Sequence, residues 1–203
     1  MRIAKEVNKV IFGIPVWLIY LTGFVPTSIL FHGAYYDRLG PDPLKVIEHE
    51  LGEYALIFLI VVLSFHPLKK FLGINLIRLR RSFGLLAFWY ATLHLLTYLV
   101  LDQQLMLDHI IRDLTKRPYI IVGALAFLIL IPLALTSNSW SVRRLGLNTW
   151  RSVHAFVYLA AFLAAMHYLM LVKSWPLEPL IYMLVIILLI GVRWISKKVF
   201  NSN

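Results

Sequence analysis

Long apolar runs separated by short polar segments make up most of the chain. Each run is close to the roughly 20 residues that an α-helix needs to cross a bilayer. They predict an all-α fold, a bundle of six transmembrane helices within a single domain that spans residues 1–203. The expected helices cover about 10–30, 45–65, 82–101, 119–135, 151–172 and 180–195.

The first run is too long for the apolar core of a signal peptide, and no small-residue cleavage site follows it. We therefore expect a retained first helix, bent at Pro15 and Pro26.

Composition excludes a soluble domain and several kinds of redox chemistry. Hydrophobic residues make up 60% of the chain and charged residues 15%, with a mean hydropathy of +0.77. Cysteine is absent, which removes disulfides, iron–sulfur clusters and thiolate ligands. Histidine, carboxylates and bound cofactors remain as the means of redox chemistry.

The net charge of +10 is concentrated on one side of the predicted bundle. If both termini share a face, that face carries 14 of the 20 lysines and arginines but only Glu6 of the ten acids. The positive-inside rule then predicts cytoplasmic termini, and the membrane-length segments argue against nucleic acid as a partner. The basic residues are Arg2, Lys5, Lys9, Lys69, Lys70, Arg78, Arg80, Arg81, Arg143, Arg144, Arg151, Arg193, Lys197 and Lys198.

Two histidines lie deep in predicted helices. His94 is 13 residues beyond Arg81, about 20 Å into the membrane, and His167 is 16 beyond Arg151, about 24 Å in. Imidazole at such depth is costly unless it has a partner, and neutral imidazole is an axial ligand of haem iron. We therefore predict that His94 and His167 bind the iron of one haem from two helices.

Alanines precede both histidines at helical spacing. Ala87 and Ala91 lie on the side of His94, and Ala160 and Ala164 on the side of His167. Small residues would leave a groove for a flat macrocycle beside each ligand. They are equally typical of helices that simply pack closely in a membrane.

The other histidines lie near the membrane surfaces. His154 is three residues past Arg151, about 5 Å in, and is a further candidate haem ligand, on a different helix face from His167. His66, followed by Pro67 at an expected helix end, is either its partner or a solvated residue. His49 lies near the outer surface, in the acidic start of the second helix.

Several motifs together resemble the MsrQ family, formerly YedZ, of the ferric-reductase-like transmembrane superfamily. The resemblance covers nearly the whole chain. The motifs are G-P-D-P-L-K-V-I-E-H (40–49), R-R-S-F-G-L (80–85), A-T-L-H (91–94), K-R-P-Y-I (116–120), R-R-L-G-L-N-T-W-R-S-V-H-A-F-V-Y (143–158) and M-H-Y (166–168).

The resemblance implies an electron-transfer subunit of the bacterial inner membrane with one or two haems b. Its haem histidines correspond to His94, His154 and His167. Such a subunit passes electrons from the quinone pool or a cytosolic flavin reductase to MsrP, a periplasmic molybdenum enzyme that repairs oxidised methionines. Catalysis would lie on that partner, and the acidic segments 37–53 and 102–113 are the expected docking surface.

The family is also associated with FMN. Arg78, Arg80 and Arg81 could pair with its phosphate, although a basic loop that only sets topology explains them equally well.

Two other functions fit some of these residues. A stand-alone transmembrane ferric or metal reductase would share the histidines, but usually carries a fused flavin and nicotinamide domain for which 203 residues leave no room. A small proton or metal transporter could use His94, His167 and Glu53, but it would need no alanine groove and would be colourless.

Overall fold

The computed structural model describes residues 2–172 and 176–201, and within these ranges the chain forms helices and connecting turns without any strand. Six helical segments in this part of the chain are long and apolar enough to cross a membrane, which confirms the predicted all-α bundle. They are Val16–Tyr35, Pro43–Leu72, Ile77–Asp102, Pro118–Leu135, Leu147–Leu171 and Leu177–Ser196.

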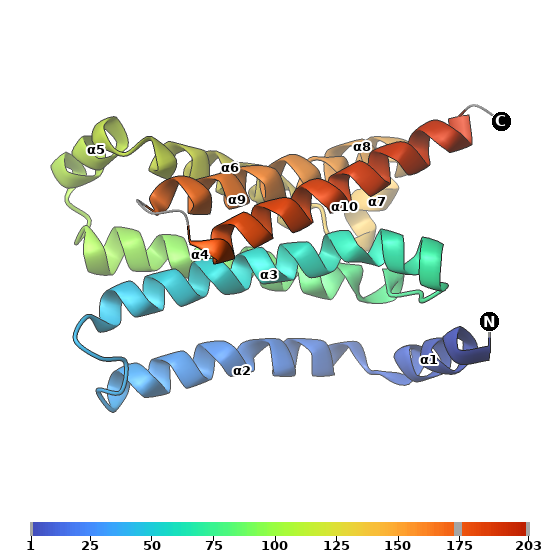
Figure 1. The fold of residues 1–203 in the computed structure, drawn as a ribbon, viewed down its shortest axis with the longest axis horizontal. Helices are drawn as coiled ribbons and strands as arrows, with labels where there is room; N and C mark the ends of the chain where they lie inside the picture. The colour runs from blue at the N-terminus through green and yellow to red at the C-terminus, as the bar shows by residue number, and fades with distance from the viewer. Residues whose placement is uncertain (1, 173–175, 202–203) are drawn as a thin grey trace.

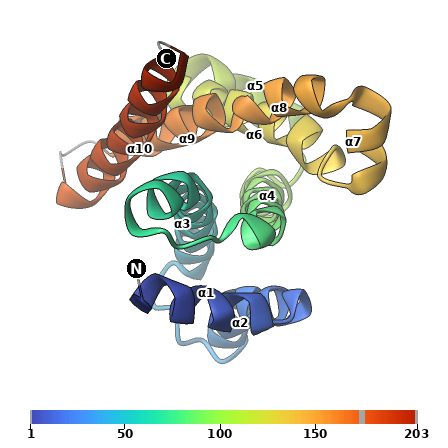
Figure 2. The ribbon, with the colours of Figure 1, turned by 90° about the vertical axis from the view of Figure 1, so that its right-hand side faces the viewer.

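The helices form three layers (Figure 2). The first holds α1 (Arg2–Gly13) and α2 (Val16–Tyr35), and the second holds α3 (Pro43–Leu72) and α4 (Arg80–Leu96). The third holds α6 (Pro118–Leu135), α9 (Val157–Leu171) and α10 (Leu177–Asn201). Both ends of the chain lie at the same end of the bundle (Figure 1), here named the inner end; the opposite end is named the outer end.

Short helices occupy segments that the sequence suggested were loops. At the outer end, α5 (Leu107–Lys116) fills most of the acidic segment 102–113 (Figure 1). At the inner end, α7 (Ser139–Leu145) and α8 (Leu147–Ala155) precede α9. In the other acidic segment, 37–53, α3 begins at Pro43, about two residues before the start expected for the second helix.

Several helix boundaries differ from the expected ones. The helix α3 continues to Leu72, so His66 and Pro67 lie inside it rather than at its end. Prolines are tolerated in membrane helices because neighbouring groups satisfy the freed carbonyl. The expected helix 151–172 is divided at Phe156 into α8 and α9, and the first run is divided at Pro15 into α1 and α2. Residues 173–175, which belong to the segment between the expected helices 151–172 and 180–195, lie outside the described residues.

The N-terminus of α3 is capped by the residue before it, Asp42. Asp42 accepts a hydrogen bond from the backbone N–H of Lys45 at 3.3 Å, and its carboxylate also pairs with the Lys45 ammonium. The side-chain hydrogen bond with Lys45 lowers the pKa of Asp42 below its ordinary value. Pro43 at the first helical position needs no hydrogen-bond acceptor for its nitrogen, which suits a helix start.

The largest buried cluster joins α3, α4, α6, α9 and α10. Most of its members have small or branched apolar side chains, and the small ones permit close helix packing. Its members are Leu56, Leu59, Leu63, Ala87, Leu130, Leu133, Val157, Ala160, Ala161, Ala165, Met183 and Ile186.

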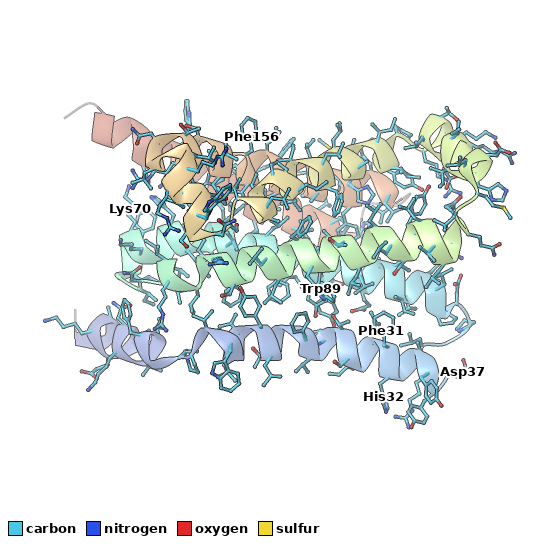
Figure 3. The ribbon with its side chains drawn as sticks, turned by 180° about the vertical axis from the view of Figure 1, so that it is seen from behind. Phe31, His32, Asp37, Lys70, Trp89 and Phe156 are labelled. Atoms are coloured by element: carbon cyan, nitrogen blue, oxygen red, sulfur yellow. The ribbon has the colours of Figure 1, made fainter. Side chains whose placement is uncertain are left out.

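The α2 layer is attached to α4 by a tyrosine. Tyr90 is fully buried, and its hydroxyl donates to the Gly23 carbonyl at 2.7 Å and accepts from the Thr27 N–H at 3.2 Å. Those two backbone groups are four residues apart, so the hydroxyl bonds to both ends of one helical turn. Nearby, Trp89 of α4 lies toward α2 (Figure 3). Its ring is edge-on to the ring of Phe24, and the two ring centroids are 5.4 Å apart.

Candidate functional site

The structure brings His94 and His167 together between α4 and α9. Their ring centroids are 6.2 Å apart, with planes inclined by 76°. Two imidazoles that bind opposite sides of one metal ion at about 2 Å need a centroid separation of about 6 Å. Neither Nε2 atom has a hydrogen-bond partner among the described residues, so both remain available as ligands.

Each imidazole is held by a backbone carbonyl of a neighbouring helix. The Nδ1 of His94 lies 2.8 Å from the Glu48 carbonyl oxygen of α3. The Nδ1 of His167 lies 2.7 Å from the Tyr119 carbonyl oxygen of α6. A carbonyl can only accept, so Nδ1 carries the proton in both rings, and the lone pair lies on Nε2. A hydrogen bond of this kind fixes the orientation of a metal-binding histidine.

A glycine follows each of these carbonyls by four residues. A Cβ on Gly52 would lie 3.1 Å from Nδ1 of His94, and a Cβ on Gly123 would lie 2.7 Å from Nδ1 of His167. A helical side chain covers the turn before its own Cα, so glycine at this spacing uncovers the carbonyl that each ring needs. Sequence reasoning missed both glycines, because each lies more than 40 residues from its histidine.

The four alanines differ in how far they are buried. Ala87 and Ala160 are fully buried within the main apolar cluster, while Ala91 and Ala164 are half-buried and pack against it. All four allow α4 and α9 to lie close to their neighbours. Their part in a macrocycle groove stays a prediction.

His154 lies on α8, close to the inner end. Its Nε2 is 3.0 Å from the Thr136 hydroxyl, and its ring stacks on Trp150 with centroids 3.9 Å apart. The same hydroxyl donates to the Pro132 carbonyl at 2.6 Å. Because its one proton is used there, the hydroxyl accepts from His154, which leaves Nδ1 of His154 as the nitrogen with a free lone pair.

His66 has a buried Nδ1 atom without a hydrogen-bond partner. His66 and His154 both interact electrostatically with Arg80, which therefore lies in the same inner region. No described contact joins the two imidazoles directly. The structure thus places them in one neighbourhood without pairing them.

The three predicted phosphate-binding arginines have different surroundings. Arg78 donates to the Phe12 carbonyl at the end of α1, and Arg81 is exposed. Arg80 is half-buried and interacts electrostatically with Arg193 and Tyr158. Among the described residues no carboxylate forms a salt bridge with these arginines. Only Arg80 therefore faces the interior of the bundle.

Polar side chains gather at the outer end beside the histidine pair. The Nε2 of His49 lies 3.1 Å from the Tyr168 hydroxyl, and Tyr182 donates to Glu53 at 2.7 Å. Ligand atoms of His49, Glu50 and Glu53 all lie within 4.8 Å of one another. The cluster belongs to the same turns of α3 that hold His94, so it lies at a similar depth to the histidine pair.

Comparisons with known proteins agree with this geometry. Residues 51–165 match the model of the family described as ferric reductase like transmembrane component. That range includes His94 and His154 but ends before His167.

Curated relatives extend the match over most of the chain. Proteins from Brucella ovis and Brucella canis are each 51% identical to it over 166 residues, which is 82% of this chain and 75% of theirs. A protein from Brucella suis has the same identity and coverage. All three are named protein-methionine-sulfoxide reductase heme-binding subunit MsrQ. With both matches covering more than half of it, the chain belongs to the MsrQ family within the ferric reductase like transmembrane proteins.

Proposed function

We propose that this chain is a haem b electron-transfer subunit of the bacterial inner membrane, which serves a periplasmic methionine sulfoxide reductase of the MsrP type. One observation carries the proposal. Two imidazoles from different helices lie 6.2 Å apart, each held through Nδ1 so that Nε2 is available to iron. The names of the Brucella relatives support haem as the group bound.

The residues around the pair fit such a group. His94 and His167 would hold the haem iron through their Nε2 atoms, and bound haem would supply one-electron exchange. The carbonyls of Glu48 and Tyr119 keep both rings in the tautomer that binds metal. The apolar cluster beneath the pair excludes water, which favours transfer of electrons over reaction with solvent.

A second cofactor position is proposed at the inner end. His154 would act there through Nδ1, either with a second haem or beside FMN. The half-buried Arg80 has no carboxylate partner among the described residues, so it is the best placed of the three arginines to pair with a phosphate. Arg78 and Arg81 would then serve topology.

The charge distribution supports one orientation of the bundle. The inner end would face the cytoplasm, and electrons would enter from the quinone pool or a cytosolic flavin reductase. The outer end carries the acidic residues, including those of α5 and the first turns of α3, and would dock the molybdenum-containing partner. Methionine sulfoxide itself would be reduced on that partner, so no catalytic residue is assigned here.

A visible spectrum tests the central claim. The detergent-purified protein, with haem supplied during expression, is compared in its oxidised and dithionite-reduced states. We expect sharp reduced bands of low-spin haem b that are lost in His94→Ala and in His167→Ala. His109→Ala, on the outer helix α5, is the matched control and should keep them.

The possible spectra distinguish between the haem function, the choice of ligands and the transporter. Bands that survive in both variants would refute this axial pair. A colourless wild-type protein would refute the haem function and favour the transporter. Bands retained in His154→Ala, with a smaller haem content, would indicate a second haem at the inner end.

A further inference from the structure

Three ionisable side chains lie close together near the outer end of α3. His49, Glu50 and Glu53 follow Pro43, where a membrane-length segment begins, and lie about 9–15 Å along that segment. Carboxylates and imidazoles within such a segment are costly, and they are typically paired with a group that compensates their charge. These side chains therefore need a partner.

No lysine or arginine supplies that partner in the described part of the chain. Neither Glu50 nor Glu53 forms a salt bridge with such a residue there. Arg38 lines the same cavity as Glu50 without pairing with it. A third carboxylate, that of Glu178 in the first turn of α10, adds negative charge beside Tyr168. The outer end of α3 thus carries two carboxylates without a basic side chain to balance them.

The ligand atoms of the three side chains converge. One nitrogen or oxygen atom from each lies within 4.8 Å of the other two. The Nδ1 of His49 and the Oε2 of Glu53 are 3.9 Å apart, which is too long for a direct hydrogen bond. It is a little under twice the length of a bond from Zn²⁺ to nitrogen or oxygen, about 2.0–2.2 Å. A single ion therefore fits between these two atoms.

A tyrosine of α9 sets the tautomer of His49. The Nε2 of His49 lies 3.1 Å from the Tyr168 hydroxyl, and this hydroxyl also interacts with the Glu178 carboxylate. A carboxylate can only accept a hydrogen bond, so the hydroxyl donates to Glu178 and accepts from Nε2. The lone pair of the imidazole is then on Nδ1, the nitrogen that faces Glu53.

A tyrosine of α10 holds Glu53 in the same way. Tyr182 donates to Oε1 of Glu53 at 2.7 Å, which leaves Oε2 facing His49 without a donor among the described residues. Outer-shell hydrogen bonds of this kind orient the ligands of metal sites. The side chains of His49 and Glu53 are 43% and 22% exposed, so a cation from the outer water can reach them.

We propose that His49, Glu50 and Glu53 bind a divalent transition-metal cation such as Zn²⁺ at the outer end of the bundle. One imidazole nitrogen with two carboxylate oxygens suits such a cation, whereas Ca²⁺ and Mg²⁺ prefer oxygen ligands alone. Its two positive charges balance the two glutamates, and water completes its coordination. The site is separate from the His94–His167 pair and does not depend on the function proposed above.

Binding is measured with Zn²⁺ itself, by equilibrium dialysis of the chelator-treated full chain in detergent. We expect one saturable site in the wild type and at least tenfold weaker binding in His49→Ala and in Glu53→Gln. The matched controls are His109→Ala and Asp108→Asn, both exposed on the outer helix α5, which should bind zinc like the wild type. Glu53→Gln keeps the shape of the side chain, so it tests the site even if His49→Ala does not fold.

X-ray absorption of the bound zinc identifies its ligands. We expect nitrogen and oxygen neighbours at about 2.0–2.2 Å that include one imidazole, which is lost in His49→Ala. Tyr182→Phe keeps all three ligands but removes the outer-shell donor to Glu53, so it should bind zinc about 10- to 100-fold more weakly. Tyr35→Phe, at a residue 84% exposed, is its control.

Several results would overturn the site. Zinc bound equally well by the wild type, His49→Ala and Glu53→Gln overturns it, as does an equal loss in Asp108→Asn, which would show a general attraction to the acidic outer end. A wild-type protein that binds no zinc overturns it in favour of a protonated His49 paired with Glu53. Two imidazoles around a zinc ion that added haem displaces would assign the ion to His94 and His167 instead.

Discussion

Gly123→Ala adds one methyl group against the ring of His167 and should loosen the predicted haem site. The new Cβ would lie 2.7 Å from Nδ1, whereas ordinary contacts begin at 3.4 Å, so the ring must shift by about 0.7 Å (3.4 minus 2.7). Such a shift can lengthen the 2.7 Å bond to the Tyr119 carbonyl beyond the range of about 2.7–3.2 Å for hydrogen bonds.

Loss of an outer-shell hydrogen bond of this kind costs about 10- to 100-fold in metal affinity, or about 1.4–2.7 kcal/mol. We expect Gly123→Ala to bind haem correspondingly more weakly and to show an altered reduced spectrum. The assay is titration of the haem-free protein with haem, followed by a redox titration of the loaded protein.

Gly191→Ala makes the same change on α10, where a Cβ would meet nothing within 4 Å, and should bind haem like the wild type. Wild-type haem affinity and spectrum in Gly123→Ala would refute the reasoning. Equal losses in both variants would show that the effect belongs to the helices in general.

Three smaller changes follow from other contacts. Gly52→Ala needs a shift of only about 0.3 Å (3.4 minus 3.1) at His94, so haem titration should show a smaller loss than in Gly123→Ala. Tyr90→Phe removes the hydroxyl that attaches α2 and should lower the free energy of unfolding, measured by thermal unfolding in detergent, by about 1–2 kcal/mol. The control Tyr35→Phe, at a residue 84% exposed, should unfold like the wild type. Equal melting temperatures for the two variants would contradict this prediction. Thr136→Val removes the partner of His154 Nε2 and should lower the free energy of unfolding by about 1 kcal/mol in the same assay. The visible spectrum of haem at the His94–His167 pair should not change. A changed spectrum would contradict the separation of the two sites.

Composition and run length were enough to predict six membrane-length helices, because no other backbone arrangement satisfies such apolar segments in lipid. Helix ends were less predictable. Pro67 suggested a boundary, yet α3 continues past it, and the polar segment around Asp108 and Arg112 is a helix whose apolar residues lie on one face.

The site was predictable only in part. Counting residues from the basic ends gave His94 and His167 similar depths, and the structure has their rings adjacent; that they bind haem stays a prediction. The carbonyls of Glu48 and Tyr119 could not be predicted, because any helical residue offers the same group. These two carbonyls are selected by the packing of α4 against α3 and of α9 against α6, which the spacing of residues along one helix does not show.

The paired use of a carbonyl and a glycine four residues later has a consequence for how such a site can arise or disappear. The two half-sites are built alike, His94 on Glu48 and Gly52, His167 on Tyr119 and Gly123, from different helix pairs. A histidine placed opposite a helical residue that carries a Cβ would meet a side chain where these rings meet an open backbone. Gaining a ligand position there requires two coordinated substitutions on separate helices, whereas one substitution at either glycine is enough to weaken it.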